Sequence, residues 1–144
     1  MRDYCFGFTG TRHGMTVAQK DTLRDFLRGS SGEFHHGDCK GADSEAHDIA
    51  DECGYGIVIH PPSNYKERAW REVPLHMMRP EKTYIARNQD IVLDTIALIA
   101  APAEPTEQPR GGTWSTVRFG LNRGRTVIII LPDGKIIQRH TGVS

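Results

Sequence analysis

The sequence predicts an α/β protein with a Rossmann-like three-layer fold, in which helices cover both faces of a mainly parallel sheet of about five strands. Short apolar runs alternate along the chain with longer segments of helical periodicity, and most of the runs are apolar without interruption. Continuous apolar runs are typical of strands buried on both faces of a parallel sheet. The length of 144 residues fits a single domain, residues 1–144, with one adequate core.

The first half of the chain contains several elements with clear signals. Strands are expected at residues 4–8, 33–36 and 56–60. The first helix starts at Thr16, through a Thr-x-x-Gln capping box with Gln19. The next helix, over residues 42–53, has the clearest helical spacing, with Asp43 placed to cap its start and Gly54 to end it.

The second half continues the alternation and ends in a hairpin. The expected elements are a helix over residues 81–94, a strand over 96–100, a helix around 113–124 and a strand over 126–131. On the first of these helices, Tyr84, Ile85, Ile91 and Val92 share one apolar face. Asp133-Gly134 is typical of a tight turn, which predicts a possible C-terminal hairpin.

The segment between these halves, residues 61–80, contains four prolines and little sustained periodicity. A long irregular connection inside a compact domain is often a lid or a binding loop. The alternative is a local excursion that covers an edge of the sheet. The sequence supports both interpretations equally.

Composition narrows the class of partner. The chain carries 18 Lys and Arg against 18 Asp and Glu, and proteins that hold nucleic acid through phosphates usually carry a basic surplus, so a small ligand is favoured. No membrane contact is expected, because no apolar run reaches the length of a membrane span and the N-terminus lacks the layout of a signal peptide. The three cysteines lack metal-type C-x-x-C spacing, which favours reduced thiols and a cytoplasmic protein.

Two glycine-rich segments are predicted to form the halves of one phosphate-binding site. The first comprises Gly10, Thr11, Arg12, His13 and Gly14, and the second Arg110, Gly111, Gly112, Thr113, Ser115 and Thr116. Glycines let the backbone approach an anion, while hydroxyls, arginines and the free N–H groups of a helix start are donors. Both segments follow strands, and ligands of such sheets bind at the carboxyl ends of the strands. Trp114 either stacks on a base or packs in the interior.

A further turn, before the helix at 42–53, adds binding candidates. They are Gly37, Asp38, Lys40 and Gly41. Lys40 is placed to neutralise a phosphate, and Asp38 or Asp43 to accept a hydrogen bond from a ribose hydroxyl, although Asp43 serves equally well as a helix cap. Asn88 lies in an apolar helix stripe, where an unpaired amide is costly, so it must bond to a neighbouring loop or to a ligand. Its neighbour Arg87 is expected to reach the rim of the site.

Four residues are candidates for acid–base catalysis, and the sequence does not choose among them. They are Asp38, Asp43, His36 and His60. A metal site would draw on His35 and His36 with Asp38 and Cys39. Because successive strand residues point to opposite faces, His35 and His36 cannot easily share one ion. We therefore expect no metal and no cofactor.

Together these segments resemble the SLOG superfamily, which joins DNA-processing A proteins and the LONELY GUY phosphoribohydrolases. The resemblance covers most of the chain and rests on Gly10-Thr11-Arg12, Gly41-Ala42-Asp43 with His47, Arg87-Asn88 and Arg110-Gly111-Gly112-Thr113 with Thr116. It implies a Rossmann-like domain that binds nucleotides or nucleotide-derived molecules, commonly as a dimer. Arg118 stands where the LONELY GUY catalytic glutamate belongs, so glycosidic hydrolysis by that route is not expected.

Three functions are consistent with these patterns. The leading one is a nucleotide-binding sensor or sequestering protein, a homodimer or higher homo-oligomer, in which residues 61–80 cover the base or sugar. The enzymatic alternative is an N-glycosidase that acts on nucleoside monophosphates. The third is a single-stranded DNA-binding module of the DNA-processing type, which the zero net charge ranks last.

Overall fold

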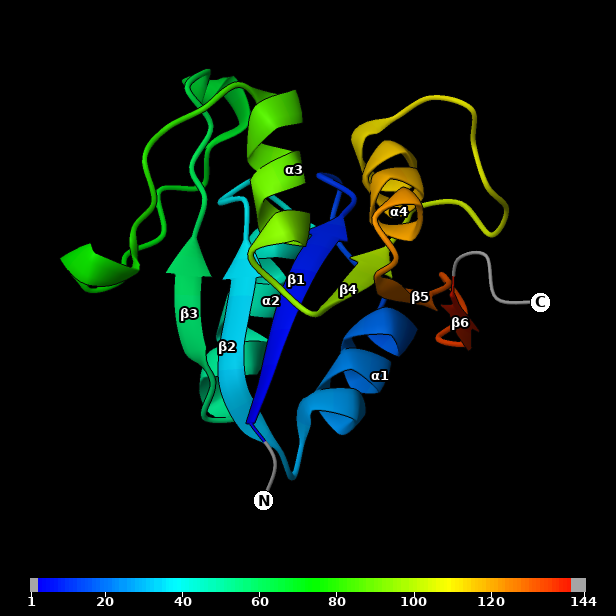
Figure 1. Cartoon of the computed structure of the whole chain (residues 1–144). Coiled ribbons are helices and arrows are strands. Elements are labelled where there is room, and N and C mark those ends of the chain that lie inside the picture. Colours follow the sequence, from blue (N-terminus) through cyan, green and yellow to red (C-terminus); the bar gives the residue numbers. More distant parts are fainter. Residues whose placement is uncertain (1–2, 141–144) are drawn as a thin grey trace.

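The computed structural model describes residues 3–140 of the chain (Figure 1). The strands are β1 (Asp3–Gly10), β2 (Ser31–His36), β3 (Gly56–Ile59), β4 (Ala97–Ala101), β5 (Thr126–Ile130) and β6 (Ile136–Arg139). The α-helices are α1 (Val17–Leu27), α2 (Ala42–Glu52), α3 (Tyr84–Leu93) and α4 (Gly112–Asn122), and two short 3-10 helices are η1 (Tyr65–Glu67) and η2 (Leu75–Met77). The alternation of strands and helices confirms the α/β class.

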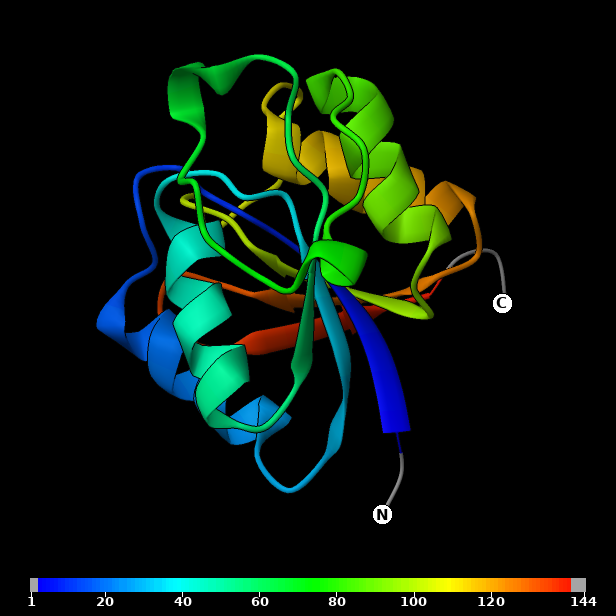
Figure 2. The same ribbon diagram turned by 90° about the vertical axis from the view of Figure 1, so that its left-hand side faces the viewer.

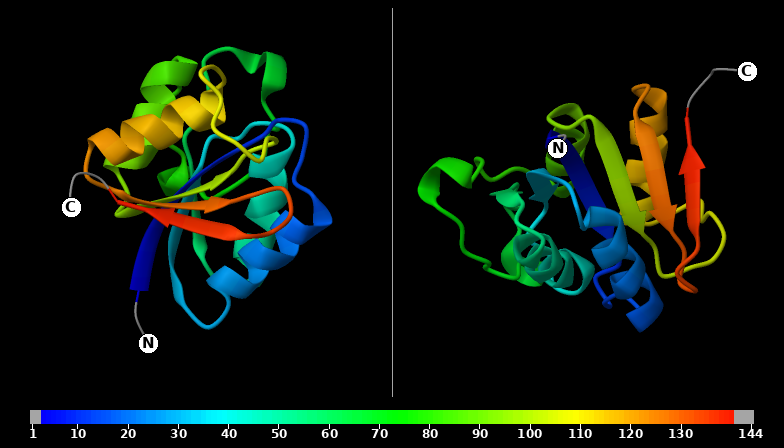
Figure 3. Two further views of the ribbon diagram at one scale, coloured as in Figure 1. Left: turned by 90° about the vertical axis from the view of Figure 1, so that its right-hand side faces the viewer. Right: turned by 90° about the horizontal axis from the view of Figure 1, so that it is seen from below.

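The strands form one sheet in the order β3-β2-β1-β4-β5-β6. All neighbouring pairs are parallel except β5 and β6, which form the expected C-terminal hairpin. Figure 3 shows β6 at the outer edge of the sheet, beyond β5. The chain moves outward from β1 to β3 and then returns to the other side of β1 with β4. The carboxyl ends of β1 and β4 therefore form the topological switch point, where open α/β sheets bind their ligands.

Helices cover both faces of the sheet and make it the middle of three layers. Figure 2 shows α1 and α2 on one side, and α3 and α4 on the other. The residues of β4 alternate between the two resulting cores. Ile99 packs in the core under α1 and α2, whereas Leu98 and Ala100 pack with Val92 of α3 and Val117 of α4. Burial of both faces explains why the strands are continuous apolar runs.

The predicted capping box is present at the start of α1. The hydroxyl of Thr16 accepts from the N–H of Gln19 at 3.0 Å, and the side-chain oxygen of Gln19 accepts from the N–H of Thr16 at 3.0 Å. At the end of α2, Gly54 has a φ of 87°, which is the left-handed conformation of a helix C-terminus. These local signals therefore located helix ends correctly.

Two details of α3 differ from the prediction. The helix begins at Tyr84 with Thr83 as its cap, and not at Glu81. Lys82 is still extended, because its N–H donates to Pro61 and its carbonyl accepts from Ser63, and this pairing delays the helix. Ile85 was expected on the buried face but is 73% exposed.

The buried side chain of Gln19 joins three elements at the carboxyl side of the sheet. Its amide nitrogen donates to the carbonyl oxygens of Pro102 at 2.8 Å and Ile130 at 2.9 Å, just after β4 and at the end of β5. Its amide oxygen belongs to the capping box of α1. One side chain thus fixes the start of α1 against the ends of two strands.

We expect the Gln19→Leu variant to lower the free energy of unfolding by at least about 2 kcal/mol, because two buried carbonyl groups and one N–H lose their partners. Urea denaturation measures this. Gln89→Leu is the matched control, since Gln89 lies half-buried on α3 and its side chain forms no hydrogen bond to the described residues. Equal stabilities of the two variants would contradict the proposed role of Gln19.

Candidate functional site

A cavity of about 580 Å³ lies at the carboxyl ends of β1 and β4. Its lining includes residues 10–13, Cys39, Asp43, residues 64, 66 and 67, residues 84, 87 and 88 of α3, and residues 103, 104 and 110–114. The structure therefore brings residues 10–13 and 110–113 of the two predicted glycine-rich segments to the same cavity, although about a hundred residues separate them in the sequence. Gly14, which was also predicted to bind the ligand, does not line the cavity. Asn64, Lys66, Tyr84 and Glu104 were missed, because no motif surrounds them.

The loop after β1 is held by the backbone of Thr11. Its N–H donates to Ala101 at 3.0 Å, and its carbonyl oxygen accepts from Gly14 at 3.2 Å and Ala42 at 2.9 Å. Gly41 has a φ of 85°, and a Cβ there would collide with the carbonyl of Arg12. Gly41 is thus a packing residue that lets the loop lie against the start of α2, and it does not line the cavity.

The start of α4 presents free donors to the cavity. Gly111 is the N-cap, with a φ of 105° and no side-chain cap. Within residues 3–140, no acceptor pairs with the N–H groups of Gly112, Thr113 and Trp114, whereas Ser115 donates to Gly111 at 3.1 Å. A Cβ on Gly112 would meet nothing within 4 Å, so packing does not require a glycine there. The unpaired N–H groups and the helix dipole favour an anion at this point.

Two predicted residues of this second segment lie differently from expectation, and a third, Trp114, packs in the interior. Ser115 and Thr116 face a groove between α3 and α4 instead of the cavity, and the hydroxyl of Thr116 donates to Gly112 at 2.7 Å. Trp114 is 3% exposed in the core, and its indole N–H donates to Glu104 at 2.9 Å. Trp114 therefore packs in the core, the second of the two interpretations, and also borders the cavity.

The buried carboxylate of Asp43 lines the cavity but does not cap α2, whose N-cap is Gly41. One of its oxygens accepts from the N–H groups of Gly37 and Cys39, both at 3.2 Å. Burial raises the pKa of Asp43 to about 6, against the opposing effects of the Arg87 charge and of these two hydrogen bonds. Gly37 is part of this support and does not line the cavity.

Asp38 anchors the segment 61–80 instead of facing the cavity. Its buried carboxylate accepts from the Nε of Arg68 at 3.0 Å and from the N–H of Arg71 at 2.9 Å. Its carbonyl accepts from Ala69 at 2.7 Å. Lys40 also lies outside the cavity lining, and its N–H donates to the carbonyl of Glu67 at 2.8 Å.

Residues 61–80 were interpreted either as a lid or binding loop or as an excursion that covers a sheet edge, and each interpretation describes part of the segment. Asn64, Lys66 and Glu67 line the cavity, as a binding loop would. Farther along, Met78 forms a bridge with Ile59 at the β3 edge of the sheet. The first part therefore borders the cavity, and the second covers a sheet edge.

Arg87 and Asn88 lie in the wall of the cavity. The guanidinium of Arg87 is buried, donates to the carbonyls of Gly37 and His60, and lies 3.6 Å from the Sγ of Cys39. Its Nε donates to the side-chain oxygen of Asn88 at 2.7 Å. The amide NH₂ of Asn88 has no hydrogen-bond partner in the described part of the chain, so it is available to a ligand.

The buried histidines form two pairs away from the cavity. His36 contacts His47 of α2 at 2.9 Å, whereas His35 contacts His60 at 2.8 Å on the other face of the sheet. The expected opposite directions of His35 and His36 are confirmed. Burial lowers the pKa of His36 well below its usual range, and burial with the neighbouring His35 lowers that of His60 to about 3. Neither His36 nor His60 lines the cavity, so neither is placed for catalysis there.

Arg118 fastens the loop that precedes α4. Its guanidinium donates to the carboxylate of Glu107 at 3.0 Å and to the carbonyls of Gln108 at 2.9 Å and Pro109 at 3.2 Å. It lines the groove between α3 and α4 and not the cavity. Its side chain thus holds residues 107–109, which lead into the cavity-lining residues 110–114, from outside the cavity.

No family model matches this sequence, and comparisons with curated proteins and solved structures give no match either. Membership of the SLOG superfamily therefore stays a prediction. Among the described residues, no helix is long and apolar enough to cross a membrane. The expected cytoplasmic location and homo-oligomer also stay predictions.

We expect the Asp43→Asn variant to gain stability relative to the wild type as the pH rises. Asp43 titrates near 3.8 in the unfolded chain but at about 6 in the folded protein. Between these values the folded state binds more protons, so the wild type loses stability with rising pH, and the variant lacks this loss. The difference in unfolding free energy should shift by about 3 kcal/mol in the variant's favour.

Urea denaturation at about pH 3.5 and about pH 7 measures this shift. The control is Asp51→Asn, which removes an exposed carboxyl from the same helix. A difference between Asp43→Asn and wild type that does not vary with pH would show that the carboxylate is not desolvated.

Proposed function

We propose that the protein binds a nucleotide or a nucleotide-derived small molecule in the cavity at the switch point, as a sensor or sequestering protein. One observation carries the proposal: the loop at residues 10–13 and the start of α4 line the same cavity. The start of α4 contributes unpaired backbone N–H groups, and the loop contributes the guanidinium of Arg12. The volume of about 580 Å³ lies within the range of small-molecule sites, about 300–1,000 Å³.

The charges around the cavity support a phosphate group. Arg12, Lys66 and Arg110 line it, and none of the three forms an ion pair within residues 3–140. The acidic side chains in the lining are Asp43, Glu67 and Glu104. Glu104 accepts from Trp114 and Asp43 accepts from backbone N–H groups, whereas the carboxylate of Glu67 has no partner within residues 3–140. The three unpaired cations outnumber this one carboxylate and can serve an anionic ligand.

The remaining lining suits the rest of a nucleotide. The carboxylate of Asp43 can accept a hydrogen bond from a ribose hydroxyl. Asn88 has a free amide NH₂, and Tyr84 supplies an aromatic surface for a base. The proposed pose places the phosphate near residues 10–13 and 110–113 and the base near α3.

Isothermal titration calorimetry with nucleoside mono-, di- and triphosphates and cyclic nucleotides tests the proposal. We expect binding to weaken roughly 10-fold or more in Arg12→Ala and Arg110→Ala, because each removes a charge-assisted hydrogen bond. Gly112→Ala should also weaken binding, because Gly112 lines the cavity at the helix start. The variant should stay folded, because the new Cβ would meet no protein atom within 4 Å. Arg28→Ala, which changes an exposed arginine of the α1 C-terminus, is the control. No heat of binding at millimolar concentration for any of these ligands would sink the proposal.

The raised pKa of Asp43 also supports the enzymatic alternative, an N-glycosidase on nucleoside monophosphates. A carboxyl with a pKa of about 6 that lines a ligand cavity is suited to general acid–base catalysis near neutral pH. Asp38, His36 and His60 do not line the cavity, which leaves Asp43 as the catalytic candidate.

If this activity exists, chromatography should detect free base released from a nucleoside monophosphate. The rate should fall about 100-fold or more in Asp43→Asn. The Asp38→Asn variant separates catalysis from folding, because Asp38 supports the fold outside the cavity. A wild-type protein that binds the nucleotide but releases no base excludes the enzyme and leaves the binding function standing.

A further inference from the structure

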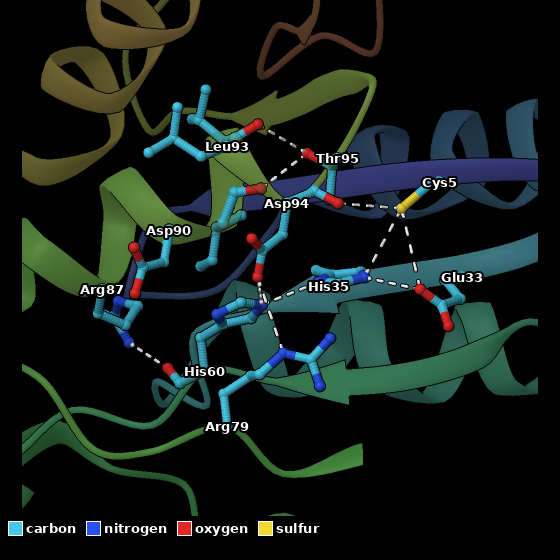
Figure 4. A network of polar contacts seen from close by, with 12 residues as sticks. Cys5, Glu33, His35, His60, Arg79, Arg87, Asp90, Leu93, Asp94 and Thr95 are labelled. Carbon is cyan, nitrogen blue, oxygen red and sulfur yellow. Dashed lines mark hydrogen bonds and ion pairs between the residues drawn. The ribbon is translucent and has the colours of Figure 1, made fainter. Parts of the chain in front are cut away.

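A second polar cluster lies on the α3 face of the sheet, near the amino-terminal half of β1 and away from the cavity. Figure 4 shows Cys5, Glu33 and His35 directed toward one another, with His60 and Asp94 beside them. The strand register explains this meeting. Cys5 of β1 pairs with Glu33 of β2 in the parallel ladder, and His35 lies two residues farther along the same strand. Side chains two residues apart share a face, so the three converge.

We propose that Cys5, Glu33 and His35 bind a divalent transition-metal ion of the zinc class. The Sγ of Cys5 lies 3.9 Å from Oε1 of Glu33 and 3.7 Å from Nε2 of His35, and the last two atoms are 3.1 Å apart. Ligand atoms around a tetrahedral zinc ion lie roughly 3.3–3.6 Å apart, given its usual bond lengths. The three atoms therefore need to move by only a few tenths of an ångström.

The chemistry of the three donors selects the ion. A thiolate and an imidazole favour zinc, cobalt or copper over magnesium and calcium, which prefer oxygen ligands. The thiolate of Cys5 and the carboxylate of Glu33 together balance the charge of a divalent ion. The Glu33 side chain is 49% exposed, so solvent reaches the cluster and supplies the fourth ligand.

The surroundings of His35 provide the support that a metal-binding histidine requires. Its Nδ1, on the side of the ring away from Cys5 and Glu33, lies 2.8 Å from Nε2 of His60. His60 in turn lies 4.0 Å from the carboxylate of Asp94, which also pairs with Arg79 at 3.7 Å. A partner on the second ring nitrogen fixes the orientation of a ligating imidazole. The positive charge of Arg79 is balanced by Asp94.

An alternative set of ligands, His35 with His60 and Asp94, is less suitable. The 2.8 Å between the two ring nitrogens is a hydrogen-bond distance and is shorter than the roughly 3.3 Å between two nitrogen ligands of one tetrahedral ion. His60 is therefore a positioning residue, and Cys5, Glu33 and His35 are the ligands.

Titration of the chelator-treated 144-residue chain with Co²⁺ and Zn²⁺ tests the site. We expect one Co²⁺ per chain, with the charge-transfer absorption of a cobalt–thiolate bond, and displacement of Co²⁺ by Zn²⁺. Cys5→Ser should abolish this absorption, and Glu33→Gln should weaken Zn²⁺ binding at least about 10-fold. Both residues are partly exposed, so the variants are expected to fold, which circular dichroism checks.

Cys53→Ser is the matched control, because Cys53 is also a half-exposed thiol but its Sγ lies near the carbonyl of Arg24, outside the cluster. This variant should keep the full cobalt absorption. His60→Gln should weaken Zn²⁺ binding about 10- to 100-fold while the cobalt–thiolate absorption remains. Absence of the absorption in the wild type, or its persistence in Cys5→Ser, overturns the proposal.

Discussion

The cavity wall depends on the hydrogen bonds that the buried guanidinium of Arg87 donates. This guanidinium is a cation in the interior, and its donors are taken up by backbone carbonyls after β2 and β3, by the Asn88 amide and by a thiol. A buried charge is tolerated only when such partners satisfy it, so the turns after β2 and β3 must lie where they do. A buried ion pair between Asp38 and Arg68 holds the neighbouring segment 61–80. Hydrogen bonds and an ion pair, as well as apolar packing, thus hold the walls of the cavity in place.

Two chemically different environments lie at different places on the sheet. At the carboxyl edge, loops and a helix start gather backbone N–H groups and cations that lack partners among the described residues, which is an environment for anions. On the α3 face, the register of β1 and β2 gathers a thiol, an imidazole and a carboxylate, which is an environment for a cation. The two environments use different strand positions, but they are connected through His60, whose carbonyl accepts from Arg87 of the cavity wall and whose ring contacts His35.

Local patterns predicted much of this arrangement. The capping box at Thr16, the apolar strands and the hairpin were confirmed, and the glycine loops lie at one cavity because parallel strands share a carboxyl edge. Tertiary contacts decided what the sequence could not. Asp43 is of a residue type that often caps a helix. Its carboxylate instead accepts from the N–H groups of Gly37 and Cys39, in the turn before the helix. Lys66 reaches the cavity only because Asp38 holds the segment that contains it, a long-range contact without a local signal.

The pairing of β1 with β4 has a consequence for how the chain folds. Phe6 and Ala97 are neighbours in this ladder although roughly ninety residues lie between them, so the pairing must close a long loop. The β1–β2 and β4–β5 units span shorter stretches and can form earlier. Because the cavity straddles the seam between them, it becomes complete only when the two halves dock, and a nascent chain acquires its folded units before it acquires its pocket.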